Sequence, residues 1–291
     1  MSGELRWDAL EGVWVGIAGS RQGRPNRPSQ DCPFCVGGLE APEPYDVKAF
    51  PNRWPMFGPG DPIALEGVRR PARGASEVVL YSPEHDASLA SLGVAGVRRV
   101  VDLWAERTEA LLARPEIEYV LVFENRGVDA GATIPHPHGQ IYAFPFVPPV
   151  PAREAEVAAR DGCVFCAEDA GDRLVHDGAE CRAYVPFASA WPYGVLVAPR
   201  RHVRSLAALD DAGRDGLAEA LVDVLGRYDR LFGRPFPYLL WVHPGDHLHV
   251  HLATPWRGSG TIRYVAAGEL GSGTLTNPVV PEEAAAALRR A

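Results

Sequence analysis

The segment PHPHGQIYAFP, residues 135–145, places polar side chains inside a run that otherwise predicts an apolar strand. Side chains alternate between two faces of an extended chain, so we expect His136, His138 and Gln140 on one face. A neutral imidazole with a pKa near 7 is a good nucleophile, and an amide can donate a hydrogen bond to an oxygen of the group under attack. The segment therefore predicts phosphoryl chemistry, with His138 as the nucleophile and Gln140 as its partner. The alternative is a set of polar residues capping a strand at a sheet edge.

Five cysteines could also do chemistry, and four of them form two C-x-x-C pairs. The pairs are Cys32 with Cys35, in DCPFC, and Cys163 with Cys166, in GCVFC. In a cytosolic chain such pairs favour metal binding over disulfides. Redox thiols and plain structural thiols are the alternatives, although neither pair sits between a strand and a helix as a redox motif would. Cys181 stands alone and is expected to be a small buried residue on a strand.

The elements that must position these residues occur twice, in the same order. After each C-x-x-C pair come a strand, a segment with a histidine, a long helical stretch, a second strand and a histidine-rich strand. The helical stretches are residues 97–113 and 214–232, and the histidine-rich strands are 135–145 and 247–255. Two copies of one α+β unit are the natural interpretation, each an antiparallel sheet with a helix. The Pro-rich connection at about 144–162 predicts a division into residues 1–150 and 151–291.

The repeat brings out two possible zinc sites, because each copy offers two cysteines and two histidines in the same order. Zinc prefers four such ligands in a tetrahedron. The expected ligands of the first site are Cys32, Cys35, His85 and His136. Those of the second site are Cys163, Cys166, His202 and His249, with His247, His251 and His243 as alternatives for the last ligand. A carboxylate could also join the second set.

Composition and charge exclude several classes of protein. The 291 residues are 46% hydrophobic and 23% charged, which is typical of a globular chain of one large domain or two small ones. The formal net charge of −8 disfavours binding to nucleic acid. No apolar run is long enough for a membrane span, and the first residues lack the pattern of a secretory leader. We therefore expect a cytoplasmic protein that binds neither nucleic acid nor membrane.

The segment FENRG at 123–127, followed by GATIPHPHGQIYAFP, resembles the active-site segment of the galactose-1-phosphate uridylyltransferase family, the nucleotidyltransferase branch of the histidine triad superfamily. The likeness extends over most of the chain, through DCPFC, FPNRWP, SPEHDASL, WPYGVLVAPRRHVRSL and LHVHLATP. It implies an α+β fold made of a duplicated histidine-triad-like unit, with two antiparallel sheets and helices related by a pseudo-two-fold axis. It also implies a homodimer.

The resemblance implies a ping-pong reaction that moves UMP between UDP-glucose and galactose 1-phosphate. His138 would carry the nucleotide covalently, Gln140 would bind a nonbridging phosphoryl oxygen, and His136 would be a zinc ligand. The remaining family positions would bind the substrates, a nucleotide sugar and a sugar 1-phosphate. These positions are Arg21 and Arg24 for phosphate, Phe50, Asn52, Phe123 and Asn125 for base, ribose and phosphates, Thr133 in place of a serine, and Glu269 for sugar hydroxyls.

The chain departs from the family pattern at several places, one of them a glutamine missing where the chain reads TLTNPVV, so other functions stay open. Arg53 stands where the family has an acid, Ile134 where it has an asparagine, and Gly268 where it has a tyrosine. The second C-x-x-C pair favours a subgroup that includes nucleotide-sugar phosphorylases, which use an ADP- or GDP-sugar with inorganic phosphate as acceptor. A nucleotide hydrolase acting through His249 is another alternative. A protein that binds zinc and nucleotide without turnover is the last.

Overall fold

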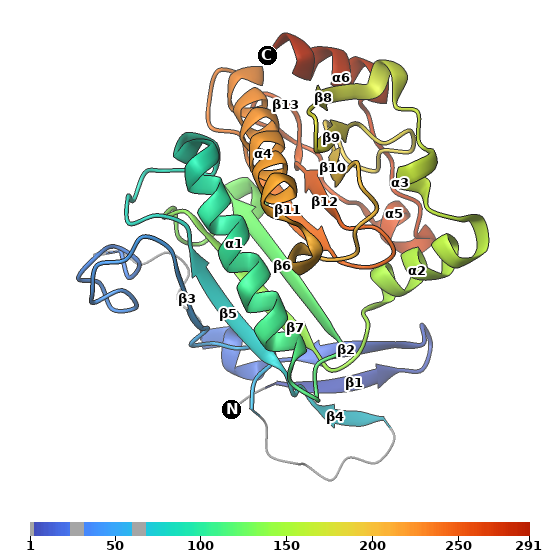
Figure 1. The fold of residues 1–291 in the computed structure, drawn as a ribbon. Coiled ribbons are helices and arrows are strands. Elements are labelled where there is room, and N and C mark those ends of the chain that lie inside the picture. Colours follow the sequence, from blue (N-terminus) through green and yellow to red (C-terminus); the bar gives the residue numbers. More distant parts are fainter. Residues whose placement is uncertain (1–2, 24–31, 60–67) are drawn as a thin grey trace.

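Alternating apolar runs from both halves of the chain form strands that pair into one antiparallel sheet (Figure 1). Its nine strands, in spatial order, are β3 (Lys48–Pro51), β5 (Ala75–Leu80), β7 (His138–Phe144), β6 (Tyr119–Arg126), β11 (Tyr238–His243), β12 (His249–Ala253), β10 (Val195–Pro199), β9 (Cys181–Tyr184) and β8 (Leu174–Asp177). The computed structural model describes residues 3–23, 32–59 and 68–291. Arg24, a predicted phosphate contact, lies outside these ranges.

The smaller elements surround this sheet. A three-stranded sheet consists of β2 (Val13–Ile17), β1 (Glu4–Asp8) and β4 (Arg69–Pro71), and a two-stranded ribbon consists of β13 (Trp256–Gly258) and β14 (Thr261–Ile262). The α-helices are α1 (Gly93–Leu112), α2 (Pro149–Asp161), α3 (Val164–Ala167), α4 (Asp211–Leu231), α5 (Ala267–Ser272) and α6 (Pro281–Arg290). Short 3₁₀ turns cover Gly19–Gly23, Ala90–Leu92, Val128–Ala130, Gly171–Arg173 and Leu206–Ala208. Among the described residues, no helix has the length and apolar character needed to cross a bilayer.

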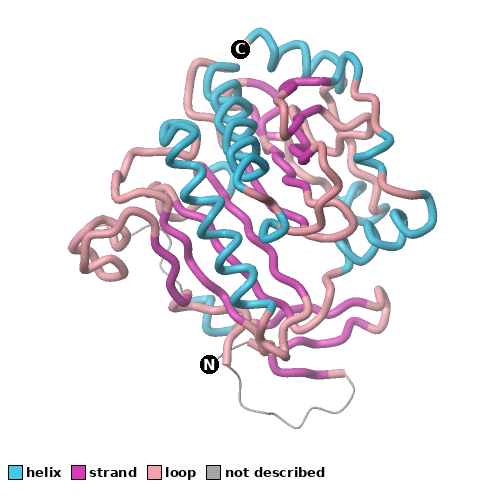
Figure 2. The backbone as a smooth tube through the Cα atoms, viewed as in Figure 1, coloured by secondary structure: helices cyan, strands magenta, loops and turns pink. Residues whose placement is uncertain are grey.

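The sheet shows the expected duplication. Strands β5, β7 and β6 of the first half are matched by β10, β12 and β11 of the second, in mirrored order about the β6–β11 pair. Helices α1 and α4 lie side by side on one face (Figure 2). The predicted antiparallel sheets with helices are confirmed. The difference is that the two sheets join at β6 and β11, where pairing covers backbone groups that would otherwise form open edges.

The boundary region differs from its expected form. Residues 144–162 contain α2, whereas the sequence indicated a Pro-rich connection. Prolines occupy its first turn, where a missing backbone N–H breaks no helical hydrogen bond. Gly162 ends the helix with a φ of 85°, a conformation that favours glycine. This helix matters for function, because it carries Glu154.

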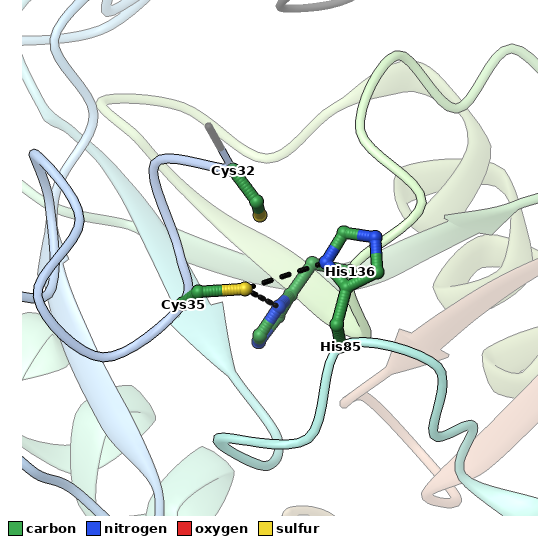
Figure 3. Close-up of side chains that lie close together, drawn as sticks. All are labelled: Cys32, Cys35, His85 and His136. Atoms are coloured by element: carbon green, nitrogen blue, oxygen red, sulfur yellow. Dashed lines mark hydrogen bonds between the residues drawn. The ribbon is translucent and has the colours of Figure 1, made fainter. Parts of the chain in front are cut away.

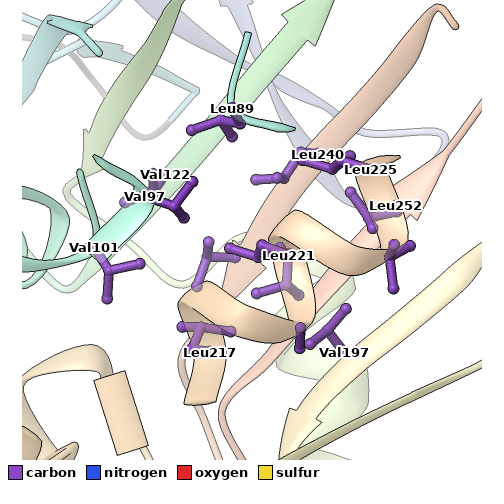
Figure 4. Close-up of a cluster of buried hydrophobic side chains, with 14 of the residues drawn as sticks. Leu89, Val97, Val101, Val122, Val197, Leu217, Leu221, Leu225, Leu240 and Leu252 are labelled. Atoms are coloured by element: carbon purple, nitrogen blue, oxygen red, sulfur yellow. The ribbon is translucent and has the colours of Figure 1, made fainter. Parts of the chain in front are cut away.

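One hydrophobic core spans both halves, between the two long helices and the sheet (Figure 4). Val101 of α1, Leu221 of α4, Val122 of β6 and Leu240 of β11 all belong to it. Burying one such aliphatic side chain contributes roughly 1.5–3 kcal/mol. Since both halves contribute, neither buries its apolar face alone.

The core also decides which face of the sheet carries the candidate site. Ile141 and Ala143 of β7 and Val122 of β6 point into the core. Side chains alternate along a strand, so His138 and Gln140 point to the opposite face. The predicted nucleophile therefore lies on the face that α1 and α4 leave uncovered.

Candidate active site

His138 is the first residue of β7, and its ring is held in one orientation. Its Nδ1 lies 2.7 Å from the backbone oxygen of His136, and its ring centroid lies 5.0 Å from that of Phe34. A carbonyl oxygen can only accept, so Nδ1 carries the proton and Nε2 keeps the lone pair of the neutral ring. The side chain is 9% exposed. An imidazole nucleophile needs an unprotonated nitrogen, and this tautomer leaves Nε2 unprotonated.

Gln140 lies two residues further along β7, on the same face. Its Oε1 accepts a hydrogen bond from Asn52 Nδ2 at 3.3 Å. The amide oxygen is thereby occupied, which leaves the amide NH₂ group to donate. Asn52 itself is fixed because its Oδ1 accepts from the backbone N–H of Trp54 at 2.9 Å.

Two adjoining cavities meet at His138. They share Asn125, Ala132, Thr133 and His138, and their volumes are about 230 Å³ and 380 Å³. The smaller one is also lined by Arg21, Phe123, Gly131, Gln140 and Tyr142. Arg21 Nη1 donates to the Tyr142 hydroxyl at 2.8 Å, which aims a guanidinium into this cavity. A cation and two amides around a histidine form a polar site suited to phosphate.

Two predicted substrate contacts lie elsewhere among the described residues. Phe50 of β3 packs against Phe34, with ring centroids 6.1 Å apart, and is absent from the lining of both cavities. Glu269 lies in α5, pairs with Arg263, and accepts from the backbone N–H groups of Ala266 and Thr276 at 2.9 and 2.8 Å. It also lines neither cavity within the described chain.

The four residues expected to form the first metal site converge (Figure 3). They are Cys32, Cys35, His85 and His136, whose ligand atoms all lie within 4.8 Å of one another. Cys35 Sγ is 3.4 Å from His85 Nδ1 and 3.7 Å from His136 Nδ1. A tetrahedral zinc ion would separate a sulfur ligand and a nitrogen ligand by about 3.6 Å. The donor set and its spacing therefore fit zinc.

The orientation of His136 is set by the groups behind it. Its Nε2 lies 2.8 Å from the carbonyl oxygen of Ser82 and 2.9 Å from the Tyr45 hydroxyl. Nε2 therefore carries the proton, and Nδ1 faces the cysteines as a ligand. Burial lowers the pKa of His136 and raises the pKa of the Cys35 thiol. The imidazole is thus neutral and can bind a metal ion through Nδ1. The thiol, in contrast, must release its proton when a metal ion binds.

The second quartet differs from the prediction in one residue. The structure brings Cys163, Cys166 and His202 together with His247 and not with His249. Cys163 Sγ and Cys166 Sγ lie 3.3 and 3.7 Å from His247 Nδ1. His247 Nε2 bonds to Pro199 O at 2.9 Å, as His136 bonds to Ser82 O. In each half, the histidine that joins the cluster is therefore the one just before the strand.

His249 matches His138 instead. Its Nδ1 lies 2.8 Å from the backbone oxygen of His247. Its Nε2 faces Glu154 Oε2 at 3.7 Å, in a third cluster that also contains His243 and His251. His243 Nδ1 lies 2.9 Å from Glu154 Oε2, and His251 Nε2 lies 3.8 Å from Glu154 Oε1. Three imidazoles and a carboxylate could hold a divalent transition metal.

Sequence reasoning missed this third cluster because Glu154 seemed to lie in a connection. A partial signal was present, since alternation along residues 247–253 places His249 and His251 on one face. His243 opposes His249 across the β11–β12 pair, which only the register shows. Glu154 enters because α2 lies over this part of the sheet.

Together, the fold and the first site define an α+β protein of two similar halves, in which a strand histidine faces two adjoining cavities beside a Cys₂His₂ cluster. Residues 67–148 match the family model described as galactose-1-phosphate uridyl transferase, N-terminal domain, and residues 166–291 match its C-terminal domain. The chain belongs to the galactose-1-phosphate uridylyltransferase family, and it is an enzyme of the nucleotidyltransferase class.

Individual relatives agree with this assignment. The galactose-1-phosphate uridylyltransferase of Thermotoga maritima is 35% identical over 310 residues, covering 98% of each chain. That of Streptomyces lividans is 38% identical over 257 residues, covering 82% of this chain and 69% of the relative. A solved uridylyltransferase superposes with a TM-score of 0.88 at 32% identity, covering 99% of this chain and 97% of the other. An ADP-glucose phosphorylase from Arabidopsis thaliana shares the fold, with a TM-score of 0.77, 24% identity, and coverage of 100% and 99%.

Proposed function

We propose that this enzyme transfers UMP from UDP-glucose to galactose 1-phosphate through a covalent nucleotidyl-His138. The observation that carries this proposal is the His138 ring, whose Nδ1 donates to His136 O at 2.7 Å and whose position is at the junction of the two cavities. Family membership at 35% identity over 98% of the chain supports the choice of substrates.

In the first half-reaction, His138 Nε2 attacks the α-phosphorus of UDP-glucose. A P–N bond forms, the P–O bond to the leaving group breaks, and glucose 1-phosphate departs. The ring becomes positively charged, and the hydrogen bond from Nδ1–H to His136 O strengthens as this charge develops. The free NH₂ group of Gln140 donates to a nonbridging oxygen, and the Arg21 guanidinium neutralises phosphate charge.

In the second half-reaction, a phosphate oxygen of galactose 1-phosphate attacks the same phosphorus. The P–N bond breaks, UDP-galactose leaves, and the neutral ring of His138 is restored. Phe123, Asn125 and Thr133 line the cavities and would hold the nucleotide through both steps. Phe50 and Arg24 stay part of the proposal as further contacts.

The proposal includes two zinc ions, one in each Cys₂His₂ cluster. Bound zinc would fix the segment before β7 by holding His136, and thereby set the position of His138. The second cluster would do the same for the segment before β12 through His247. The S₂N₂ donor set of each cluster supports zinc over harder ions.

Assembly, domain division and location complete the proposal. We place the division near residue 150, because the two halves of the central sheet meet at the β6–β11 pair.

A homodimer is supported by Glu269, since this predicted sugar contact lines neither cavity of its own chain and a second copy could supply it. A cytoplasmic location is supported by the five cysteines, all of which are thiols.

Intact-protein mass spectrometry tests the proposal directly. Zinc-replete protein is mixed briefly with UDP-glucose, ADP-glucose or a GDP-sugar and quenched at mildly alkaline pH, because phosphoramidates are labile in acid. A gain of one uridylyl group with UDP-glucose supports the proposal. No gain with any donor contradicts it and favours a protein that binds zinc and nucleotide without turnover.

Two variants locate the nucleophile. His138→Asn should gain no mass, whereas His249→Asn, altered at the matching position of the second half, should still be labelled. The opposite result would assign the chemistry to the second half, as in a nucleotide hydrolase.

A nucleotide-sugar phosphorylase is the second candidate. The ADP-glucose phosphorylase of Arabidopsis thaliana is 26% identical over 333 residues, covering 99% of this chain and 93% of the relative. The acceptor decides between the two activities. Release of the label from His138 by galactose 1-phosphate supports the transferase, and release by inorganic phosphate alone supports the phosphorylase.

A further inference from the structure

The smaller of the two cavities extends along β7, from His138 to Tyr142. Side chains alternate along a strand, so Tyr142 lies on the same face of β7 as His138 and Gln140. All three residues line this cavity, together with Arg21. Four residues of an extended strand span about 13 Å, so Tyr142 lies well beyond the nucleophile, with Gln140 between them.

Aromatic neighbours hold the ring of Tyr142 in place. The rings of Phe123, Phe57 and Phe144 meet it edge-on, with centroids 4.8, 5.8 and 6.2 Å away. Edge-to-face contacts of this kind favour one orientation of a ring, and Phe57 is itself buried. The hydroxyl therefore has a set position in the cavity, and a ligand that binds it loses little affinity to side-chain ordering.

The Tyr142 hydroxyl has a hydrogen-bond partner on one side only. It accepts from Arg21 Nη1 at 2.8 Å, and among the described residues it donates to no other group. A phenol has one O–H to donate, and the guanidinium keeps its remaining N–H groups. No acidic side chain lines this cavity in the described part of the chain. Arg21 and Tyr142 thus place a cation and a neutral donor side by side, an arrangement that suits a phosphate group.

The geometry of displacement at phosphorus decides which phosphate lies there. In phosphoryl transfer the attacking atom, the phosphorus and the leaving oxygen are roughly in line. His138 Nε2 attacks from one end of the cavity, and Gln140 binds the phosphorus that is attacked. The leaving phosphate therefore extends away from His138, toward Arg21 and Tyr142. In the second half-reaction the incoming phosphate approaches from the same side.

We propose that Tyr142 is a binding residue for the sugar 1-phosphate. Its hydroxyl accepts from Arg21 and donates to the phosphate that leaves in the first half-reaction and attacks in the second. The hydroxyl keeps its proton throughout, so the contact is a hydrogen bond that stabilises phosphate charge. The inference rests on the proposed function in taking His138 as the nucleophile and a sugar 1-phosphate as its leaving group.

Binding of galactose 1-phosphate without any nucleotide tests this contact in the absence of turnover. Tyr142→Phe removes the hydroxyl and keeps the ring, so the affinity measured by calorimetry should fall about 10- to 100-fold, as expected for a lost hydrogen bond to a charged group. Tyr119→Phe is the matched control and should bind as the parent does. Tyr119 lies on the neighbouring strand β6, and its hydroxyl forms no hydrogen bond within the described residues. Equal affinities of Tyr142→Phe and the parent would overturn the inference.

Release of the nucleotide from labelled His138 separates phosphate binding from a displaced strand. In Tyr142→Phe, the KM for release by galactose 1-phosphate should rise about 10- to 100-fold. Slow release by water alone should keep its parental rate, because water does not use the phosphate site. A change in both would show that the strand itself has moved, and would refute the assigned contact.

A double-mutant cycle tests whether Arg21 and Tyr142 act together. Arg21→Ala with Tyr142→Phe should weaken binding of galactose 1-phosphate by less than the product of the two single losses, because the two side chains share a hydrogen bond. Independent losses would contradict the paired arrangement.

The binding experiment also distinguishes this inference from the proposed function. If no labelled enzyme forms but Tyr142→Phe still weakens binding of galactose 1-phosphate, the proposed function fails and the phosphate contact stands. If labelled enzyme forms but the variant binds as the parent does, nucleotidyl transfer stands and the contact is refuted. A parent protein that does not bind galactose 1-phosphate refutes the contact as well.

Discussion

His138 and His249 occupy matching positions in the two halves, yet their neighbours give them different chemistry. Each donates Nδ1–H to the carbonyl oxygen two residues earlier, at 2.7 and 2.8 Å. His138 then faces two cavities, whereas His249 Nε2 faces the carboxylate of Glu154 at 3.7 Å. The cavities at His138 and the Glu154 carboxylate at His249 therefore distinguish two histidines whose rings are held in the same way.

The first prediction concerns the nucleophile itself. His138→Asn should abolish uridylyl transfer, because the asparagine amide has no lone pair suited to attack on phosphorus. The zinc content and the unfolding temperature should stay at parental values, since His138 belongs to none of the metal clusters found among the described residues. Metal analysis and calorimetry on the variant check both points. Substantial transfer by this variant would disprove the mechanism.

The second prediction concerns the first metal cluster. Cys32→Ser should lower the zinc content by one equivalent and reduce stability, because a structural zinc ion contributes folding free energy. Since burial raises the pKa of the Cys35 thiol, protons compete with the metal, and zinc should be lost progressively as the pH falls. Elemental analysis after dialysis at stepped pH measures this loss. Cys181→Ser is the control, because Cys181 is buried outside the clusters and its loss should not change the zinc content.

At the scale of the element, the side chains on the two faces of β7 have different surroundings. One face presents His138 and Gln140, and the other packs Ile141 and Ala143 into the core. Gly139 lies between His138 and Gln140 and leaves room for the Tyr81 hydroxyl. Any side chain at 139 must therefore move either Tyr81 or the strand.

The third prediction follows from this contact. Gly139→Ala should destabilise the protein by about 1–3 kcal/mol, because overpacking shifts the backbone, and should slow transfer. Adding Tyr81→Phe should restore part of the stability and part of the transfer rate, since the closest clash, at 2.0 Å, is with the Tyr81 hydroxyl. Denaturant unfolding and transfer rates measure the effect. Gly268→Ala, where no atom lies within 4 Å of the added Cβ, is the matched control. An unchanged Gly139→Ala enzyme would show that the strand tolerates displacement.

At the scale of the whole molecule, the two halves share one sheet and one hydrophobic core. Their sheets pair through β6 and β11, and their helices α1 and α4 share one core. Arg98 of α1 reinforces the junction by pairing with Asp211 and Asp215 of α4 at 2.7 and 2.6 Å. A change in the core of one half should therefore reach the site in the other.

The fourth prediction tests this coupling. Leu221→Ala, in the second half, should reduce stability by about 2–5 kcal/mol, because Leu221 is fully buried in the shared core. Hydrogen exchange should accelerate equally in β7 and β12. Leu270→Ala, at a side chain 74% exposed, should leave the hydrogen-exchange rates of both strands unchanged. Acceleration confined to β12 would mean that the halves unfold independently.

The sequence by itself placed His138 and Gln140 on one face of a strand and indicated the first Cys₂His₂ cluster and the two α+β copies. Those features lie within short motifs or repeat in order, so alternation along a strand and ligand spacing suffice. Helices expected at 97–113 and 214–232 are found as α1 and α4, because their apolar spacing is strong.

Only the tertiary structure decided the rest. It brought His247, and not His249, to Cys163, Cys166 and His202, because His247 lies just before the strand and binds Pro199 O. It brought Glu154 of α2 to three histidines about 90 residues away, and joined two sheets into one. These outcomes depend on register and on contacts between distant segments. No local pattern of residues encodes such contacts, because packing in three dimensions selects them.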